Sequence, residues 1–402
     1  MAFLDFVAPC PYCYTDIDLR KVDFRCLGRP AAGRQSCQKV VDKVRQDQFG
    51  DVNEYYPSFK PDKTSMREMR QAECPKCFGV TGVRLCPSCH SRLPEGFAGD
   101  SPLYGLVGAR SAGKTVMLAV LMRELATNGP VARRFNDVIT VYGGGEEKSQ
   151  ATKLKTLLDQ MESSSGQLPE QTQQAAIERA LPVVFEWKSA RDGLAKTALG
   201  DYRSTVFSFY DTAGEDLANA TRAESMTYLL ATDGVILLLD PFSFTGNSTR
   251  GKALADQKVE TSPENVLEAI TYVLKQNEQT KRNRQIKQPV AVVISKIDAF
   301  FNQIAQGDPI RQPSSQLPYF DEAESKSVHD HMAALVAQWG GQGLLRALDM
   351  DYANYRLFGL SALGSEPNYS TQQVDQRGIL PHRVAEPLLW LMAQRGSIPR
   401  QG

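Results

Sequence analysis

The stretch Gly108-Ala109-Arg110-Ser111-Ala112-Gly113-Lys114-Thr115 fits the pattern GxxxxGK[ST] and follows the apolar run Leu103-Tyr104-Gly105-Leu106-Val107. Its glycines let the backbone curl so that successive N–H groups point inward, and apolar residues then recur at helical spacing as far as Leu125. The alternative is a glycine turn before an ordinary helix. Because an apolar strand precedes the glycines and a helix follows them, we expect a phosphate-binding loop here.

The residues of this loop have distinct expected tasks. Lys114 would place a positive charge at the β- and γ-phosphates of a nucleotide, and Thr115 would offer its hydroxyl to Mg²⁺. The backbone of the remaining positions would hold phosphate oxygens; these positions are Gly108, Ala109, Arg110, Ser111, Ala112 and Gly113. The phosphate loop and the beginning of the helix that follows it together predict a nucleotide-binding site.

Length and charge bound the remaining possibilities. The chain has 402 residues, enough for two or three domains, and a formal net charge of +0 at pH 7. No global field therefore draws it to nucleic acid or to anionic lipid, although a local basic patch is compatible with this balance. We expect no signal peptide and no transmembrane segment, because no apolar run is long enough, and we expect a cytoplasmic location.

The cysteines are confined to the part of the chain before the phosphate loop. Their clustering in a reducing compartment favours metal over disulfides. Three CxxC pairs and two single cysteines occur: Cys10 and Cys13, Cys74 and Cys77, Cys86 and Cys89, then Cys26 and Cys37. Four thiolates form a closed tetrahedral Zn²⁺ site, so we expect two structural sites rather than free or redox thiols.

The pairing of the cysteines has more than one solution. The compact pair of knuckles at residues 74–77 and 86–89 predicts one site, and the first four cysteines, at 10, 13, 26 and 37, predict the other. Interleaving of the two sets stays open. His90 is an alternative ligand to Cys89, but we favour a solvated histidine.

The cysteine pattern also sets the expected domains. We expect a zinc-ribbon module over residues 1–98, with loops or an inserted segment over 46–70. A nucleotide-binding domain would follow over residues 99–402, with insertions near 130–180 and 299–326. Closed zinc sites leave no open position for catalysis, so the module is expected to fold around metal and to bind a partner.

Further strands and helices alternate after the first helix, which predicts an α/β domain with a doubly wound, mostly parallel sheet. The expected strands are 137–142, 181–187, 205–210, 234–240, 289–294 and 356–360. The expected helices are a polar one through 154–161, one from 262 to 274, one from about 327 to 348, and a closing amphipathic one over 386–392. We expect the closing helix to pack in the core rather than to form a binding face.

Two stretches near the predicted strand ends suit a nucleotide switch. Asp211 follows the strand at 205–210 and would hold Mg²⁺, while Gly214 would offer its N–H to the γ-phosphate. The alternative for Asp211 is a turn-capping aspartate. A switch also needs a threonine on a mobile loop; Thr172 is our choice and Thr140 its rival, and an ordinary surface threonine explains either equally well.

The strand at 289–294 ends in Ser295-Lys296-Ile297-Asp298. The carboxylate of Asp298 can accept hydrogen bonds from N1–H and the N2 amino group of guanine, which adenine does not supply, and the stem of Lys296 can lie along the base. A polar strand end is the alternative. Ser361 and Ala362 follow a later strand and would offer backbone N–H groups to the base oxygen.

In this order, the four motifs resemble those of translation-factor and Ras-like P-loop GTPases over roughly residues 102–396. The resemblance implies GTP or GDP as ligand, Mg²⁺ as cofactor, and a switch that rearranges on hydrolysis. The cysteine module, the long segment before Thr172 and the closing Glu386-Pro387-Leu388-Leu389-Trp390 resemble bacterial double-GTPase-type proteins of conflict or signalling systems.

Three positions depart from the pattern of these GTPases. Ser295 stands where Asn or Thr is usual, and its hydroxyl would bridge to the phosphate loop. Glu215 stands where a glutamine often orients the attacking water, so unassisted hydrolysis should be slow unless a partner supplies an arginine. Arg110 lies inside the phosphate loop, where it would stabilise transition-state charge or, as we favour, point to solvent.

These observations predict a GTP-binding switch that hydrolyses GTP with help from a protein partner, an activator or an effector. The expected catalytic residues are Lys114, Thr172, Gly214 and Glu215. A nucleotide-binding adaptor with little or no hydrolysis is the second hypothesis. A zinc-ribbon nucleic-acid binder regulated by GTP is the third and is not favoured, because basic and acidic side chains are mixed before Pro102.

Overall fold

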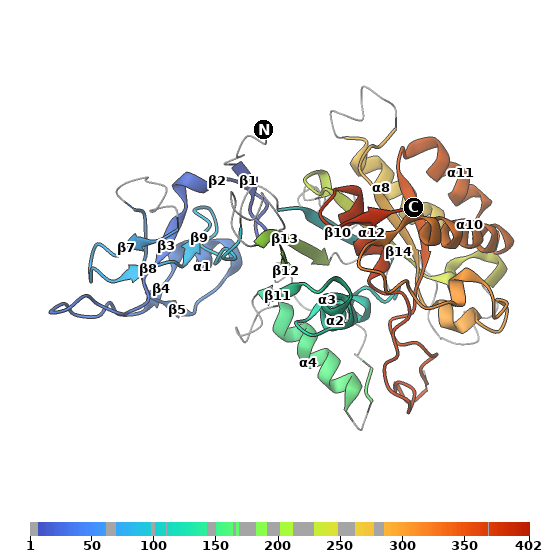
Figure 1. Ribbon diagram of the computed structural model, residues 1–402, viewed down its shortest axis with the longest axis horizontal. Coiled ribbons are helices and arrows are strands. Elements are labelled where there is room, and N and C mark those ends of the chain that lie inside the picture. Colours follow the sequence, from blue (N-terminus) through green and yellow to red (C-terminus); the bar gives the residue numbers. More distant parts are fainter. Residues whose placement is uncertain are drawn as a thin grey trace. The chain divides into compact units, whose positions relative to one another are not determined.

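The computed structural model describes most of the chain in several stretches (Figure 1). These are residues 7–61, 70–97, 101–109, 111–142, 150–163, 166–168, 182–190, 202–211 (backbone only at 210 and 211), 229–247, 262–276, 285–368 and 370–402. The chain divides into two compact units, one of residues 1–102 with 174–208 and one of residues 103–173 with 209–402. The expected domains, 1–98 and 99–402 with two insertions, stay a prediction.

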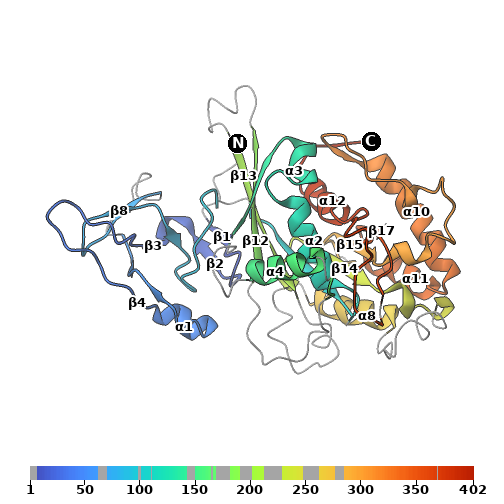
Figure 2. The same cartoon turned by 90° about the horizontal axis from the view of Figure 1, so that it is seen from below.

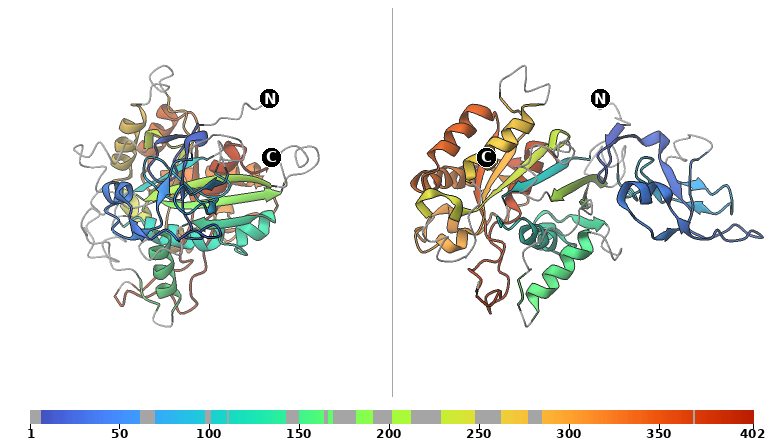
Figure 3. Two further views of the ribbon diagram at one scale, coloured as in Figure 1. Left: turned by 90° about the vertical axis from the view of Figure 1, so that its left-hand side faces the viewer. Right: turned by 180° about the vertical axis from the view of Figure 1, so that it is seen from behind.

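The cysteine-rich part, blue in Figure 3, is built from very short strands in small sheets. Its elements are β1 (Val7–Pro9), β2 (Asp16–Asp18), η1 (Leu19–Lys21), β3 (Asp23–Arg25), β4 (Val40–Val41), α1 (Lys43–Phe49), β5 (Glu54–Tyr55), β6 (Ser58–Phe59), β7 (Ala72–Glu73), β8 (Val80–Thr81) and β9 (Arg84–Leu85). The largest sheet has the order β6-β3-β9, and fully buried Phe24 lies on its central strand. Such strands bury little apolar surface, as expected for a module that folds around metal.

The stretch 46–70, expected to form loops or an inserted segment, contains the end of α1 and strands β5 and β6. The expectation of loops was therefore wrong for residues 46–49, 54–55 and 58–59. The Asp42 carboxylate caps α1 by accepting the Arg45 N–H, and Gly50 ends the helix in the left-handed conformation. Local capping chemistry therefore sets this helix, although its sequence lacks an apolar stripe.

A seven-stranded sheet forms the centre of the remaining structure, in the order β11-β12-β13-β10-β14-β15-β17. Its strands are β10 (Leu103–Gly108), β11 (Val138–Tyr142), β12 (Val183–Ala190), β13 (Tyr202–Asp211), β14 (Gly234–Leu239), β15 (Val290–Ile294) and β17 (Tyr355–Gly359). Every residue of β10, β14 and β15 is buried, as expected for strands covered on both faces. All six later strands expected from the sequence are confirmed.

Four neighbouring strands of this sheet run parallel, with registers that pair Tyr104 with Gly234, Val235 with Val290, and Val290 with Tyr355. Because these strands share one direction, the loops that follow β10, β14, β15 and β17 emerge at the same edge. The fold is the predicted α/β, doubly wound, mostly parallel sheet, and this edge is where a ligand would bind.

The helices of the sheet-containing part are α2 (Lys114–Leu125), α3 (Pro130–Phe135), α4 (Gln150–Glu162), α8 (Pro263–Leu274), α10 (Glu322–Gln338), α11 (Gln342–Asp351) and α12 (Glu386–Gln394). Short elements complete it: η3 (Pro241–Ser243), η4 (Thr245–Asn247), η5 (Ile297–Phe300), η6 (Pro309–Arg311), β16 (Phe320–Asp321) and β18 (Arg400–Gln401). Helix α12, red in Figure 2, packs against β14 and β15. Its residues 386–393 are all buried. The expected core packing is therefore confirmed, but the helix is buried all round rather than amphipathic.

The single helix expected over residues 327–348 is in fact two helices, α10 and α11 (Figure 1). They are separated at Gly340, whose φ is +89°, and a Cβ there would lie 2.4 Å from Thr245 Oγ1. The left-handed backbone of Gly340 and its close approach to the segment at Thr245 break the helix there, although the apolar spacing of the sequence continues. Within the described ranges, none of the helices combines the length and hydropathy that a bilayer-spanning helix requires.

Candidate functional site

The phosphate loop connects the end of β10 to the first residue of α2. Gly113 has φ +87° and Ser111 has φ +63°, so the loop twice enters the left-handed region. A Cβ at Gly113 would meet nothing within 4 Å, whereas one at Gly108 would lie 2.3 Å from the Leu238 carbonyl oxygen. Gly113 is therefore needed for its torsion angles, and Gly108 for the close approach of β10 to β14.

Lys114 is the first residue of α2 and folds back over the loop. Its Nζ donates to the carbonyl oxygens of Gly108, at 2.7 Å, and Ala109, at 2.9 Å, and the residue is only 9 % exposed. Thr115, which follows in the first turn, is half-buried. The loop therefore holds a nearly desolvated cation at the amino end of a helix, an arrangement suited to phosphate.

Lys296 joins this loop to the segment after β15. Its Nζ donates to the Ser111 carbonyl oxygen at 2.9 Å and to Asp240 Oδ2 at 2.7 Å. The same Nζ lies 5.9 Å from the centroid of the Phe242 ring. The backbone of Lys296 is left-handed, with φ +52°, which directs the chain into η5. One side chain thus spans the segments after β10, β14 and β15.

Asp298 lies in η5, next to the loop that follows β17. Burial raises the pKa of Asp298, although the hydrogen bond with Ser361 and the charge of Lys296 oppose this shift. The Ile297 N–H donates to the Leu360 carbonyl oxygen at 3.1 Å and holds the two segments together. A carboxylate and the backbone near Ser361 therefore meet at one place, as guanine recognition requires.

Ser295 does not make the expected bridge to the phosphate loop. Its hydroxyl donates to the Leu239 carbonyl oxygen at 3.1 Å, and its N–H donates to the same oxygen at 3.0 Å. Both groups stay at the end of β14, because Ser295 is buried where the two parallel strands end. The link to the phosphate loop comes from Lys296 instead.

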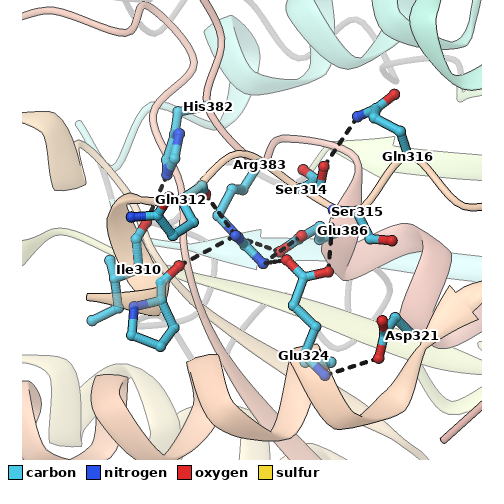
Figure 4. Close-up of polar contacts among 12 residues, drawn as sticks. Ile310, Gln312, Ser314, Ser315, Gln316, Asp321, Glu324, His382, Arg383 and Glu386 are labelled. Atoms are coloured by element: carbon cyan, nitrogen blue, oxygen red, sulfur yellow. Dashed lines mark hydrogen bonds and ion pairs between the residues drawn. The ribbon is translucent and has the colours of Figure 1, made fainter. Parts of the chain in front are cut away.

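The loop that contains Ser361 pairs with the backbone of His382, and Figure 4 shows the polar contacts of His382 and Arg383. Ser361 exchanges two backbone hydrogen bonds with His382, at 3.0 and 2.8 Å, and its Oγ accepts the Gly364 N–H at 2.8 Å. The His382 ring donates from Nε2 to the Ile310 carbonyl oxygen at 2.7 Å. Burial lowers the pKa of His382, which favours the neutral ring.

Arg383 fixes this support to two helices. Its Nη2 lies 2.6 Å from Glu324 Oε1 on α10, and its Nε donates to Glu386 Oε2 on α12 at 2.8 Å. A further bond runs from Nη1 to the Gln312 carbonyl oxygen at 2.7 Å. Burial lowers the pKa of Arg383, but the two carboxylates outweigh burial and raise it overall. The guanidinium is 1 % exposed, so this is a buried charged network.

The cysteines form two groups, and their pairing interleaves along the chain. One group contains Cys10, Cys13, Cys86 and Cys89, and the other contains Cys26, Cys37, Cys74 and Cys77. Sulfur–sulfur separations within the groups include 3.8 Å (Cys10–Cys89), 3.7 Å (Cys13–Cys86), 3.5 Å (Cys26–Cys77) and 3.9 Å (Cys37–Cys74). The sequential grouping favoured from the spacing is therefore wrong, and the interleaved one is right.

These separations fit a tetrahedral metal. Sulfurs at about 2.3 Å from a central zinc ion lie about 3.8 Å apart, whereas a disulfide needs about 2.0 Å. The three CxxC knuckles also share one backbone form: the residue after each second cysteine has positive φ, 61° at Tyr14, 55° at Phe78 and 51° at His90. In each knuckle this residue donates its N–H to the carbonyl of the first cysteine. The donor sets fit zinc.

His90 is neither a ligand nor a solvated side chain. Its Nδ1 lies 2.8 Å from Asp42 Oδ1 and its Nε2 lies 3.3 Å from Asp23 Oδ2, and the residue is buried. Arg25 Nη2 is 2.7 Å from Asp42 Oδ2. The expectation of a solvated histidine was wrong, because the knuckle turns the ring inward onto two carboxylates.

The sequence model of the family Double-GTPase 2 matches residues 103–360. This span contains the phosphate loop, Lys296 and Asp298. The chain belongs to the Double-GTPase 2 family. Membership makes it a P-loop GTPase, which supports GTP or GDP as ligand and Mg²⁺ as cofactor. The two buried cysteine groups fit the predicted zinc ribbons.

Other similarities are more distant. A protein of Mycolicibacterium smegmatis named "Putative ESX-1 scaffolding and assembly protein SaeC" is 25 % identical over 354 residues, covering 81 % of this chain and 84 % of that protein. Among solved structures, the signal recognition particle receptor SRb-GTP/SRX complex from Chaetomium thermophilum is 14 % identical, covers 67 % of this chain and 96 % of that one, and has a TM-score of 0.29. The Arl6 BBS3 small GTPase from Trypanosoma brucei is 12 % identical, covers 74 % and 99 %, and has a TM-score of 0.30.

In this Double-GTPase 2 chain, three segments lie at the edge where the parallel strands end. They are the phosphate loop, the segment with Lys296 and Asp298, and the loop with Ser361. Thr140, the rival switch threonine, lies within β11 rather than on a loop. Asp211 ends β13, but its side chain lies outside the described residues. Four other predicted residues also lie outside them: Arg110, Thr172, Gly214 and Glu215.

Sequence reasoning missed Asp240, which holds Lys296, and Arg383, which supports the Ser361 loop. Asp240 ends the apolar run of β14 just as Asp211 ends that of β13, so its position at a strand end was a usable signal. Arg383 has one local partner, Glu386, three positions later. Its contacts with Gln312 and Glu324 join residues 71 and 59 positions apart, which no local pattern indicates.

Proposed function

We propose that this protein is a GTP-binding molecular switch that hydrolyses GTP slowly by itself and faster with a protein partner. The observation that carries the proposal is the link from Lys296 to both Ser111 and Asp240, at 2.9 and 2.7 Å. It couples the segment suited to guanine with the loop suited to phosphate. Family membership supports the same ligand.

Each group of the site would have its own task in this switch. Lys114 and the loop N–H groups would hold the β- and γ-phosphates, and Asp298 would accept hydrogen bonds from the guanine edge. Thr115 and Asp211 would hold Mg²⁺, which offsets phosphate charge when bound. Thr172, Gly214 and Glu215 would respond to the γ-phosphate. A carboxylate at position 215 orients water poorly beside phosphate oxygens, which supports a role for a partner.

We assign the two cysteine groups to structural zinc and the module around them to partner binding. Closed sites of four cysteines leave no position for a substrate. The relative SaeC is named as a scaffolding and assembly protein, which supports protein partners rather than nucleic acid. Thiolate ligands need a reducing compartment, so we place the protein in the cytoplasm.

The name of SaeC also favours a second candidate function, a nucleotide-binding adaptor with little or no hydrolysis. Release of phosphate from GTP distinguishes the two. We expect slow release by the full chain and loss of all release in Lys114→Ala, because the phosphates lose their cation. The matched control is Lys326→Ala, an exposed lysine on α10, which should not change the rate. Release that persists in Lys114→Ala would reject hydrolysis at this site, and its absence from the wild type would favour the adaptor.

A further inference from the structure

The cysteine-rich module exposes many of the large apolar side chains. Of the thirteen large exposed hydrophobic residues among the described ranges, seven lie between Val7 and Val80, in the smaller part of the structure. Val40 is 51 % exposed and Val80 is 59 % exposed. Single exposed apolar residues are ordinary, but a gathering of them marks an interaction surface.

Basic side chains lie among these apolar residues. Between Leu27 and Val41 the charged residues are Arg29, Arg34 and Lys39, which are all basic and all exposed. Within the part of the chain that the structure describes, none of the three forms an ion pair. Exposed Arg377, by contrast, is paired with Asp375, and exposed Arg20 with Asp18.

Several contacts join these residues into one surface. The Arg34 guanidinium lies 4.4 Å from the centroid of the Phe78 ring, and the Ala31 N–H donates to the Cys77 carbonyl oxygen at 3.0 Å. A Cβ at Gly79 would lie 1.9 Å from the Arg29 carbonyl oxygen. The segment that carries the basic residues therefore lies against the knuckle that precedes Val80.

Contacts with residues 55 and 56 hold both ends of the segment from Leu27 to Val41. Lys39 Nζ lies 5.6 Å from the centroid of the Tyr56 ring, and that ring packs on Gly28, next to Leu27. Val40 pairs with Tyr55 between β4 and β5. We call the surface formed by Leu27, Arg29, Arg34, Lys39, Val40 and Val80 the basic apolar face.

We propose that the basic apolar face binds an acidic protein segment that carries aliphatic side chains. This inference rests on the proposed function, in which the zinc module engages a partner. Three cations without carboxylate partners match an acidic segment, and the exposed aliphatic side chains of the face match apolar ones. One exposed carboxylate, that of Glu73, lies across the strand pair from Val80. Single-stranded nucleic acid is a poorer match, because it needs open aromatic rings for stacking and Arg34 covers the face of Phe78.

Fluorescence anisotropy with the full, zinc-loaded chain tests this inference. The probe is a labelled peptide of about 12 residues that alternates Glu and Leu. Comparison probes replace Glu by Lys, or Leu by Ser, and a single-stranded RNA of about 20 nucleotides tests nucleic acid. We expect the Glu/Leu peptide to bind more tightly than all three.

Two variants and their matched controls locate the binding. Arg29→Glu/Arg34→Glu/Lys39→Glu should weaken binding by about tenfold or more, because three attractions become repulsions. The control Arg20→Glu/Lys21→Glu/Lys326→Glu changes net charge equally and should have little effect. Val40→Thr/Val80→Thr keeps shape but adds hydroxyls and should weaken binding by about threefold, whereas Val7→Thr/Val138→Thr should not.

The outcomes separate this inference from the proposed function, because GTP binding is measured on the same samples. Failure to bind GTP would reject the switch and leave the peptide result standing. Equal binding of the Lys/Leu peptide, tighter binding of RNA, absence of peptide binding, or equal effects of variants and controls would overturn the basic apolar face as an acidic-segment site.

Discussion

Lys296 Nζ lies 2.9 Å from the Ser111 carbonyl oxygen, although 185 positions separate the two residues in the chain. This contact joins the loop suited to phosphate to the segment suited to guanine, and Asp240 completes it at 2.7 Å. A nucleotide that fills both segments would therefore meet one connected site, in which base recognition and phosphate binding depend on each other.

Removal of the Asp240 carboxylate should weaken guanine nucleotide binding. Asp240→Asn leaves Lys296 with neutral oxygen acceptors only, and loss of a partly exposed ion pair costs about 0.5–1 kcal/mol, or about threefold in affinity. Titration with a fluorescent GDP analogue measures this. Asp375→Asn, which breaks an exposed pair with Arg377, is the control and should bind normally. Equal affinity of Asp240→Asn and wild type would contradict the role of this pair.

Binding of GTP should weaken as the pH falls, and should do so above the pH at which an ordinary aspartate titrates. Burial raises the pKa of Asp298, and only its ionised form accepts two hydrogen bonds from guanine. Affinity measured from about pH 7.5 to about pH 5 should therefore fall in the wild type but stay flatter in Asp298→Asn. The same pH dependence in both proteins would show that another group is responsible.

The stability of the free protein should respond to Asp298 in the opposite direction. A raised folded-state pKa of a carboxyl group favours the folded state below the unfolded pKa of about 3.9, and this contribution is lost as the pH rises through the folded pKa. In the neutral range, Asp298→Asn should therefore be as stable as the wild type or slightly more stable. Thermal melts of wild type and Asp298→Asn at neutral pH check this. A large loss of stability in Asp298→Asn would show that burial of the ionised Asp298 carboxylate does not destabilise the free protein.

Zinc content tests the interleaved pairing of the cysteines directly. Cys10→Ser/Cys86→Ser damages one group and should leave one zinc ion per chain, whereas Cys10→Ser/Cys26→Ser damages both and should leave none. Sequential pairing makes the opposite prediction for each double variant. Elemental analysis of the purified full chain gives the two ratios, with the wild type, at two zinc ions, as reference.

Replacement of Arg383 should destabilise the GTPase part strongly. Arg383→Ala leaves Glu386 buried without its cation, and a broken buried pair typically costs about 3–5 kcal/mol. Arg383→Met keeps the volume and should cost no more than Arg383→Ala. Chemical denaturation measures both, with Arg377→Ala as an exposed control that should change stability by less than about 0.5 kcal/mol. A loss in Arg383→Ala no larger than in the control would show that the network is not structural.

The strands and the phosphate loop could be predicted because their signals are local. β14 and β15 are continuous apolar runs because parallel strands are covered on both faces. Gly113 indicates a left-handed turn just before a helix. The ends of these strands then placed Lys296 and Asp298 at one edge of the sheet. No distant contact was needed for any of these predictions.

The features that sequence reasoning missed depend on residues far apart in the chain. A CxxC knuckle supplies two thiolates whichever second knuckle faces it, so spacing could not select the partner of Cys10. The break between α10 and α11 is set by contact of Gly340 with Thr245, and the inward turn of His90 by carboxylates of other elements. The Ser295 hydroxyl donates to the Leu239 carbonyl oxygen rather than to the phosphate loop. This partner depends on how the ends of β14 and β15 pack together, which the sequence does not show.

Calorimetric titration of the full chain with GTP, ATP and XTP tests the central claim most directly. The account predicts that wild type binds GTP in clear preference to ATP, and that Asp298→Asn loses this preference and gains affinity for XTP. Xanthine offers a carbonyl where guanine has an amino group, and the Asn amide can donate to it. Equal binding of GTP and ATP by the wild type, or an unchanged preference in Asp298→Asn, would contradict guanine recognition at this site.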